Sequence, residues 1–340
     1  MRLSISRLFA FGLAITLASC GGAASPPPTL PSTVPALDAT YAAPLDISVP
    51  VAQLPAARLT NDLSKRPPLF DARHAALASA NRELPLSSIP ASEHGSEGIG
   101  IDAGGPYRAL YAIHSAYDAS AITFAPGQAY TLFAPTSHMS NGSCLEVGNA
   151  YYTDANGNIV AQFYVFDFCL SQPTYAFLAT IDDQFESNYV RVVNKNKGSG
   201  LHQKLPYYIT EIVATPKNSR RPLDANTTWT ALLYNHTTGS WDRVYSDTGS
   251  TGATSGGWSI FEDYFPAGPC PSLGPTFAAD ALKLYNEQTR QWELLAPQMA
   301  RTTTSVNPFA QSSCFCADST GPASYGFDLE APNSEWAVTE

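Results

Sequence analysis

Short segments in which apolar and polar residues alternate, or in which apolar residues run together, follow one another along the chain from residue 107 onward. Alternation with a period of two is typical of strands that bury one face, and turn residues separate these segments. We expect strands at 107–114, 129–134, 144–153, 159–168, 175–181, 189–194, 207–214, 228–234, 241–246, 257–265, 277–285 and 291–295. So many strands with almost no helix predict an all-β domain over 105–300, built as two stacked antiparallel sheets, a β-sandwich.

The first twenty residues have a different pattern. Arg2 and Arg7 precede an apolar stretch that ends in Leu17-Ala-Ser-Cys20, which is the order of a signal peptide. The last four residues resemble a bacterial lipobox, which implies removal of residues 1–19 and lipid attachment to Cys20. Gly21 in the next position, with no Asp there, resembles lipoproteins of the outer membrane. An ordinary signal peptide with an incidental cysteine is the alternative.

Residues 20–104 lack the strand pattern. Ten prolines fall within 20–68, so we expect a semi-extended tether there that buries no core. Within 69–104, the stretch Asp71–Asn81 predicts one short helix with Asp71 as its N-cap, followed by a linker. The helix either packs on the edge of the domain or belongs to a pro-segment that covers a site.

Charge and hydropathy narrow the function classes. The net charge is −10, the pI is about 5.0 and only 14% of the residues are charged. An acidic chain without a basic patch is not expected to bind nucleic acid. No apolar run reaches the roughly 18 residues of a membrane span. We therefore expect an exported monomer in the bacterial cell envelope, held on a membrane only by its lipid anchor.

Asn156-Gly157 between two apolar segments predicts a hairpin with a two-residue type I′ turn. Counting outward from that turn pairs Cys144 with Cys169, at a position where the backbones approach closely enough for a disulfide. The same count places Glu146 opposite Asp167, on the face of Cys144, and predicts that the opposite face packs on the core. Two facing carboxylates are either solvated on an outer face, or share a proton in a site that uses a raised pKa.

The remaining cysteines and the histidines do not form a metal motif. Cys270 is expected to bond Cys314 or Cys316 and so to tie a C-terminal extension, 301–340, to the domain. Cys314-Phe-Cys316 lacks the spacing of a zinc site, the six histidines are scattered, and the sequence has no phosphate-binding loop or G-x-S-x-G motif. We expect no metal and no cofactor.

A second carboxylate lies in an aromatic strand. Alternation would place Trp258, Ile260, Glu262 and Tyr264 on one face of the segment 256–266. An apolar wall raises the pKa of a carboxyl group, as a general acid requires. The alternative is a glutamate at a sheet edge whose charge reaches the solvent.

These segments resemble the glutamic peptidases (eqolisins) over roughly 105–295. Gly256–Pro266 is similar to the strand that carries the catalytic Glu in that family, Glu146-Val-Gly148 to its Gln-x-Gly strand, and Tyr234–Gly239 to its Asn-x-Thr-x-Gly hairpin. The resemblance implies a concanavalin-like or jelly-roll sandwich that hydrolyses peptides at acid pH without a metal. Glu146 and Glu262 would form the catalytic pair, supported by Asp167, Trp258 and Tyr264, with Asp167 tuning Glu146.

The sequence departs from the family at two places. Glu146 stands where eqolisins have Gln, although the related neprosin peptidases use Glu-x-Gly. Trp258 precedes Glu262 by four residues instead of three, a difference that a bulge would explain.

Two other functions stay open, a carbohydrate-binding or adhesion module and a glucanase-like glycoside hydrolase with a paired-carboxylate site. The binding module would stack polysaccharide on four exposed tryptophans, Trp229, Trp241, Trp258 and Trp292.

Overall fold

The computed structural model describes the part of the chain that carries the β-structure. Its described residues are 41–67, 94–103, 107–124, 131–139, 142–196, 202–217, 223–252, 257–266, 274–306, 315–316, 325–331 and 334–339. All of them belong to one compact unit, Leu37–Glu340. The predicted signal peptide with Cys20, the predicted helix at 71–81, and Cys270 and Cys314 lie outside the described residues.

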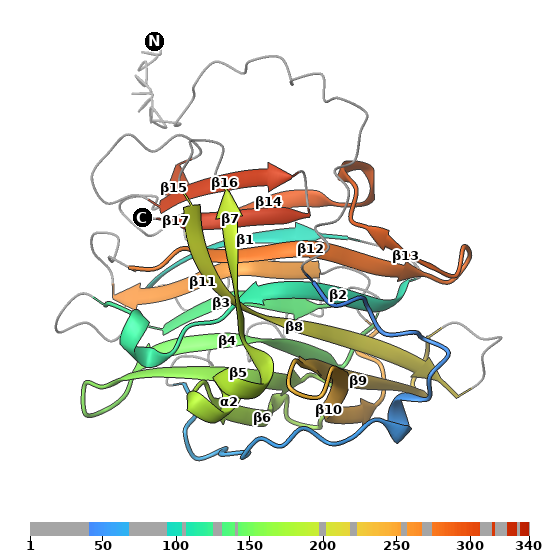
Figure 1. Ribbon diagram of the computed structural model, residues 1–340. Helices are drawn as coiled ribbons and strands as arrows, with labels where there is room; N and C mark the ends of the chain where they lie inside the picture. The colour runs from blue at the N-terminus through green and yellow to red at the C-terminus, as the bar shows by residue number, and fades with distance from the viewer. Residues whose placement is uncertain are drawn as a thin grey trace, which may run out of the picture. The chain divides into compact units, whose positions relative to one another are not determined.

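One sheet has seven antiparallel strands and carries the candidate site (Figure 1). Its strands, in spatial order, are β14 (Arg301–Val306), β1 (His94–Asp102), β11 (Gly257–Pro266), β3 (Thr131–His138), β4 (Leu145–Thr153), β5 (Ile159–Asp167) and β6 (Thr174–Thr180). β3 therefore lies directly between β11 and β4, the two strands that carry Glu262 and Glu146.

The second sheet has ten strands. Eight follow one path: β10 (Ser240–Thr248), β9 (Thr227–Asn235), β8 (His202–Pro216), β2 (Tyr107–Ser115), β12 (Phe277–Asn286), β17 (Glu335–Thr339), β16 (Tyr325–Ala331) and β15 (Phe315–Cys316). β13 (Gln291–Leu294) pairs with β12, and β7 (Arg191–Asn196) pairs with β8. Among the described pairs of strands, only the short β15–β16 contact is parallel.

Helical structure in the described residues is limited to α2 (Asp183–Tyr189) and three single turns, η1 (Val51–Gln53), η3 (Ala119–Ala121) and η4 (Pro297–Met299). The predicted all-β sandwich class is confirmed. No helix of the described part is long and apolar enough to cross a membrane.

The core lies between the two sheets. Leu145, Val147 and Tyr151 of β4 are buried there, together with Leu110 and Ile212 of the other sheet. Polar groups are also bonded across this layer. The ring of His114 on β2 is hydrogen-bonded to Ser137 Oγ on β3 at 2.9 Å and to the hydroxyl of Tyr208 on β8 at 3.1 Å.

Two predicted boundaries are wrong. Residues 94–102, expected to lie in a linker, form β1 between β11 and β14. Residues 301–306, 325–331 and 335–339, expected in a disulfide-tied C-terminal extension, form β14, β16 and β17 of the two sheets. The sequence of β1, His-Gly-Ser-Glu-Gly-Ile-Gly-Ile-Asp, has few apolar residues and many glycines, so periodicity did not identify it.

Residues 41–67, which we call the strap, are not a free tether. The strap lies along the sandwich, and Leu45 and Val51 are buried against it. Ala57 and Arg243 of β10 are joined by a main-chain hydrogen bond, and Asp62 N–H donates to the carbonyl of Leu178 on β6. Proline removes a backbone donor but keeps an extended chain and an acceptor, so a proline-rich segment can still pack on a sheet.

Candidate active site

The β4–β5 hairpin fixes the surroundings of Glu146, and its turn differs from the predicted one. Asp154 N–H donates to Asn158 C=O at 2.8 Å, and Gly157 N–H donates to Asp154 C=O at 3.0 Å. Gly157 has φ +81°, the left-handed conformation that favours glycine. These contacts describe a three-residue loop with a glycine bulge instead of a two-residue type I′ turn.

The extra loop residue shifts the pairing by one position. Thr153 pairs with Ile159, Glu146 pairs with Phe166, and Asp167 pairs with Leu145. A slip of one residue turns every side chain of one strand to the other face. The prediction that Asp167 faces and tunes Glu146 is therefore wrong, because Asp167 lies on the core side with Leu145.

The predicted disulfide between Cys144 and Cys169 is present, with its Cα atoms 5.0 Å apart. It lies just beyond the paired part of the hairpin, where Phe168 N–H donates to Cys144 C=O at 2.7 Å. Asp167 is close enough to both sulfurs to resemble a metal-binding group. Because the two sulfurs are bonded to each other, they offer no thiolate to a metal.

Asp167 contributes to the contact between the two sheets. Its carboxylate accepts from the hydroxyl of Tyr245 on β10 at 2.9 Å and from the N–H of Cys169 at 2.8 Å. Burial raises the pKa of Asp167 to about 6, these two donors oppose the rise, and nearby Asp247 adds to it.

Glu146 lies on the outer face of the seven-stranded sheet, the face turned away from the other sheet. Only 4% of Glu146 is exposed, and Tyr164 of β5 donates its hydroxyl proton to Glu146 Oε1 at 2.6 Å. Around it is an apolar layer, the outer cluster, whose members are Phe133, Ala150, Tyr164, Phe166, Tyr175 and Leu178, with Phe168 packed against them. The carboxyl group of Glu146 therefore lies beside a cluster of mostly aromatic side chains.

Gly148, two residues after Glu146, is needed for the close approach of β3. A Cβ at this position would lie 2.8 Å from the carbonyl oxygen of Pro135 and 2.8 Å from Thr136 Cγ2. The Glu-x-Gly spacing thus has a steric reason, because the glycine brings β3 close to the strand that carries the carboxylate. His138, at the end of β3, pairs with Glu146.

The strand pairing also assigns a face to position 262, whose side chain is not among those described. Residue 262 pairs with Phe133 of β3, and Phe133 pairs with Ala150 of β4. Directly paired residues of antiparallel strands lie on the same face, as do residues four apart on one strand. Positions 146 and 262 thus share the outer face, with one strand between theirs.

A bulge in β11 separates Trp258 from that face. The pairing with β1 shifts by one residue between Ile99 and Gly100, so that position 258 pairs with Ile101 and position 262 with Gly98. Ile101 is buried in the core, three residues from Gly98. Trp258 and Glu262 therefore lie on opposite faces, contrary to the predicted alternation, whereas position 264 keeps the face of 262.

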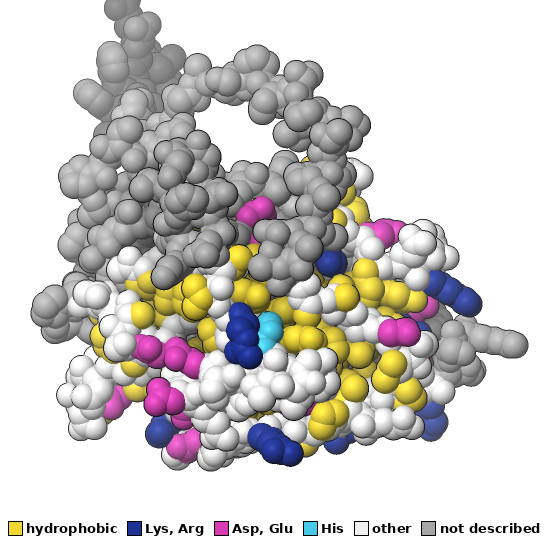
Figure 2. Space-filling view, viewed as in Figure 1, with side chains coloured by type: hydrophobic (Ala, Val, Ile, Leu, Met, Phe, Trp, Pro, Cys, Tyr) yellow, Lys and Arg dark blue, Asp and Glu magenta, His cyan; other side chains and the backbone are white. Residues whose placement is uncertain are grey.

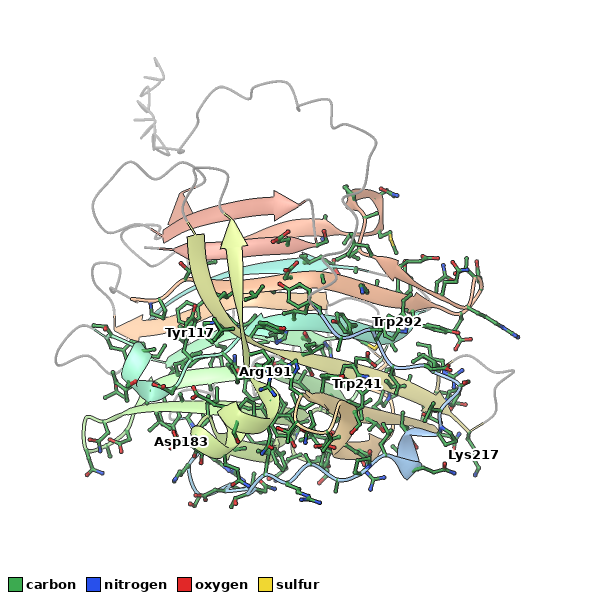
Figure 3. The ribbon with its side chains drawn as sticks, viewed as in Figure 1. Tyr117, Asp183, Arg191, Lys217, Trp241 and Trp292 are labelled. Carbon is green, nitrogen blue, oxygen red and sulfur yellow. A yellow bond between two sulfur atoms is a disulfide. The ribbon has the colours of Figure 1, made fainter. Side chains whose placement is uncertain are left out.

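Three of the four tryptophans proposed for sugar stacking are not exposed platforms. Trp229 is fully buried, and its Nε1 donates to Gly249 C=O at 3.0 Å. Trp241 is buried, and Trp292 is half-buried, with its Nε1 donating to Leu45 C=O at 3.1 Å. Figure 3 shows Trp241 and Trp292 on the side of the ten-stranded sheet along which the strap runs. The prediction that these three side chains are exposed is wrong.

Sequence analysis missed two residues beside Glu146. Tyr164 falls on the core face in the predicted register, and His138 is one of the six histidines that are scattered along the sequence. The correct turn would have revealed Tyr164, because shifting β5 by one residue places its even-numbered positions on the face of Glu146.

Comparison with known proteins finds no matching family model and no matching curated protein. Among solved structures, the chain is similar to Scytalido-glutamic peptidase, in one structure with a peptide-based transition-state analogue and in another with a transition-state analogue inhibitor. Both have 10% identity and a TM-score of 0.33. A third is SCP-B, a member of the Eqolisin family in complex with the tripeptide Ala-Ile-His, with 13% identity and a TM-score of 0.29. Each alignment covers 73% of this chain and 99% of the other.

Proposed function

We propose that this chain is a peptidase-like hydrolase in which Glu146 and Glu262 form a carboxyl pair that cleaves peptide bonds at acid pH. The observation that carries the proposal is the register, which assigns both positions to one face of one sheet with only β3 between their strands. The likeness of both segments to glutamic-peptidase motifs supports it. So does the bulge in β11, which absorbs one residue between Trp258 and Glu262 and so accounts for their four-residue spacing.

The chemistry is direct attack of water on the peptide carbonyl. An ionised carboxylate removes a proton from the bound water, while a protonated carboxyl donates its proton to the carbonyl oxygen. When the resulting diol collapses, the first carboxyl passes the water proton to the leaving amine, and the second recovers a proton from a diol hydroxyl, so that both return to their starting states. We assign the base to Glu146, because the Tyr164 hydroxyl bonded to its Oε1 orients the carboxyl group. Glu262 then supplies the acid. Since one group must be ionised and the other protonated, activity is confined to acid pH.

The test is the conservative removal of each carboxyl. Glu146→Gln and Glu262→Gln should each lower casein cleavage at about pH 3–5 by at least 100-fold, the usual scale of general acid–base catalysis. Glu287→Gln, in an exposed turn, is the matched control and should keep full activity. Circular dichroism should show the same fold in all three variants. Undiminished cleavage by either site variant, measured with the purified protein, would exclude the pair.

We also propose that the chain is exported and lipid-anchored at Cys20. The support is the sequence Leu17-Ala-Ser-Cys20 at the end of the apolar stretch. Metabolic labelling with an alkyne fatty acid should mark the wild-type chain in the membrane fraction, because a multiply acylated cysteine is firmly held by a bilayer. Cys20→Ala should be unlabelled and leave that fraction. Labelling of Cys20→Ala would contradict the anchor site.

A further inference from the structure

The strap is held on the outer face of the ten-stranded sheet mainly through its backbone. Leu45 N–H donates to Glu211 Oε1 of β8 at 2.7 Å, and Leu45 C=O accepts from Trp292 Nε1 of β13 at 3.1 Å. Ala42 C=O accepts from the hydroxyl of Tyr111 on β2 at 2.9 Å. Side chains from three strands thus converge on the main chain of one short extended segment, which is how a protein surface recognises a peptide irrespective of most of its side chains.

Two strap side chains add selectivity. The ring of Tyr41 packs edge-on against Tyr207 with 5.0 Å between the centroids, and its hydroxyl donates to Asp280 Oδ2 at 2.8 Å. Leu45 is buried. The strap thus presents an aromatic residue followed four positions later by a buried apolar one, and Pro44 between them keeps the preceding Ala43 extended.

The surface beneath the strap contains buried ionisable side chains, whose burial costs folding free energy. Glu211 is fully buried, and Lys283 is 8% exposed with its Nζ 4.8 Å from the centre of the Tyr111 ring. Burial raises the pKa of Glu211 well above its usual value. Moreover, Glu211 Oε2 is buried and has no hydrogen-bond partner among the described residues. A buried carboxyl that the strap satisfies at only one of its two oxygens is a costly group to keep for structure alone.

The strap also lacks the contacts of a sheet strand. Its pairing with the domain in the described residues is one isolated bridge, Ala56 with Arg243. Figure 1 shows the strap as a blue strand-free trace that crosses in front of the ten-stranded sheet near β2 and then follows the lower edge of the molecule. Figure 2, from the same side, shows apolar side chains gathered across the middle of this face with charged groups scattered among them.

We propose that the outer face of the ten-stranded sheet around Glu211 is a peptide-binding site, which the chain occupies with its own residues 41–46. The ligand class is an extended peptide with an aromatic residue four positions before an apolar one, as in Tyr41-Ala-Ala-Pro-Leu45. The site binds the same sequence on a separate molecule once its own strap is released. It is distinct from the face that carries Glu146.

The experiment uses the full chain with a site-specific protease sequence inserted between residues 80 and 81, so that one cut frees the strap from the domain. A fluorescein-labelled synthetic peptide of residues 41–67 is added before and after the cut, and its anisotropy is followed. We expect no binding to the uncut chain and saturable, one-to-one binding after the cut, with native mass spectrometry showing exchange of the strap for the labelled peptide.

Matched variants test whether the backbone is what is recognised. In the peptide, Leu45→Pro removes the N–H that Glu211 accepts and should weaken binding at least tenfold, whereas Gln53→Ala, an exposed position, should leave it unchanged. In the protein, Tyr111→Phe removes the donor to Ala42 and should weaken binding about three- to tenfold. Tyr285→Phe is its control, because the Tyr285 ring packs on Trp292 while its hydroxyl bonds none of the described strap residues.

Three results would overturn the proposal. The first is a strap that never exchanges with excess peptide while the cut chain stays folded. The second is equal binding of the Leu45→Pro peptide, or equal binding by the two tyrosine variants. If the cut chain instead loses its near-ultraviolet circular dichroism, added peptide must restore the signal saturably, and failure to do so is the third.

Discussion

Single buried residues make the stability of this sandwich depend on pH in opposite directions. Asp167 is a carboxyl whose folded-state pKa of about 6 exceeds the ordinary value of 3.8. His114 is an imidazole whose pKa burial lowers from 6.5 to about 3. Stability rises with pH where the unfolded chain binds more protons, and falls with pH where the folded chain does. The two groups therefore oppose each other over much of the acid range.

Asp167→Asn should abolish the decrease in the free energy of unfolding that Asp167 causes as the pH rises. Between about pH 4 and 6 the folded protein keeps the Asp167 proton that the unfolded chain releases, so the free energy of unfolding falls as the pH rises. Urea unfolding of wild type and variant across this window should show a more negative slope for wild type. Asp183→Asn, on the exposed surface of α2, is the control. Parallel curves for wild type and Asp167→Asn would contradict the assignment.

His114→Gln should abolish the decrease in the free energy of unfolding that His114 causes as the pH falls. Below pH 6.5 the unfolded chain protonates this histidine while the folded protein keeps it neutral down to about pH 3, so wild type loses stability as the pH falls. Glutamine can keep hydrogen bonds to Ser137 and Tyr208 without titrating. The difference in unfolding free energy between variant and wild type should therefore shift in favour of the variant from pH 7 to pH 4. A difference that does not change with pH would exclude His114 as the source.

At the scale of elements, the alternating pattern located most central strands but did not fix their register. The strand pattern of residues 144–153 and 159–168 was sufficient to predict β4 and β5. Their pairing depends on the conformation of Gly157, and an Asn-Gly pair is compatible with more than one loop. Hence the disulfide partner of Cys144 was predicted correctly, whereas the residue paired with Glu146 across the hairpin was not. β1 was missed because its sequence has few apolar residues and many glycines, so that it lacks the alternating pattern.

Gly148→Ala should destabilise the protein and perturb the outer face. The added methyl group would lie 2.8 Å from the Pro135 carbonyl oxygen, so β3 and β4 must separate, at a cost of about 1–3 kcal/mol. Gly157→Ala is the comparison, because its Cβ would meet nothing within 4 Å and only the positive φ is penalised, by roughly 1 kcal/mol. Urea unfolding should rank Gly148→Ala as the less stable variant. The reverse order would show that the strands yield easily.

For the whole molecule, the last strands are part of the sandwich instead of an appendage. β17 pairs with β12, and Trp336 on it is fully buried in the core. Trp336→Ala should therefore lower the free energy of unfolding by about 3–5 kcal/mol, the cost of emptying a large core site. Trp292→Ala, at a half-buried position, should cost less. Thermal unfolding would reveal the difference, and an unchanged Tm for Trp336→Ala would mean that these strands are dispensable.

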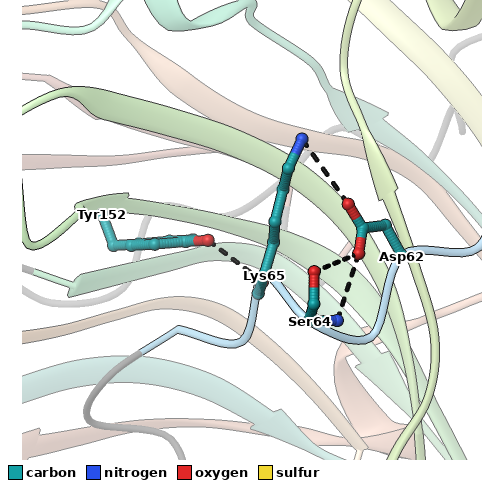
Figure 4. A network of polar contacts seen from close by, with 4 residues as sticks. All are labelled: Asp62, Ser64, Lys65 and Tyr152. Atoms are coloured by element: carbon teal, nitrogen blue, oxygen red, sulfur yellow. Dashed lines mark hydrogen bonds and ion pairs between the residues drawn. The ribbon is translucent and has the colours of Figure 1, made fainter.

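The strap has a consequence that spans the molecule. It begins over Glu211 and ends where the Tyr152 hydroxyl donates to Lys65 C=O, with Asp62 bonding Ser64 and Lys65 nearby (Figure 4). Tyr152 is six residues along β4 from Glu146 and has the same outward orientation. Because both ends of this segment are bonded to the domain, release of one end weakens the attachment of the other. By reciprocity, a ligand that binds at either end changes the free energy with which the opposite end is attached.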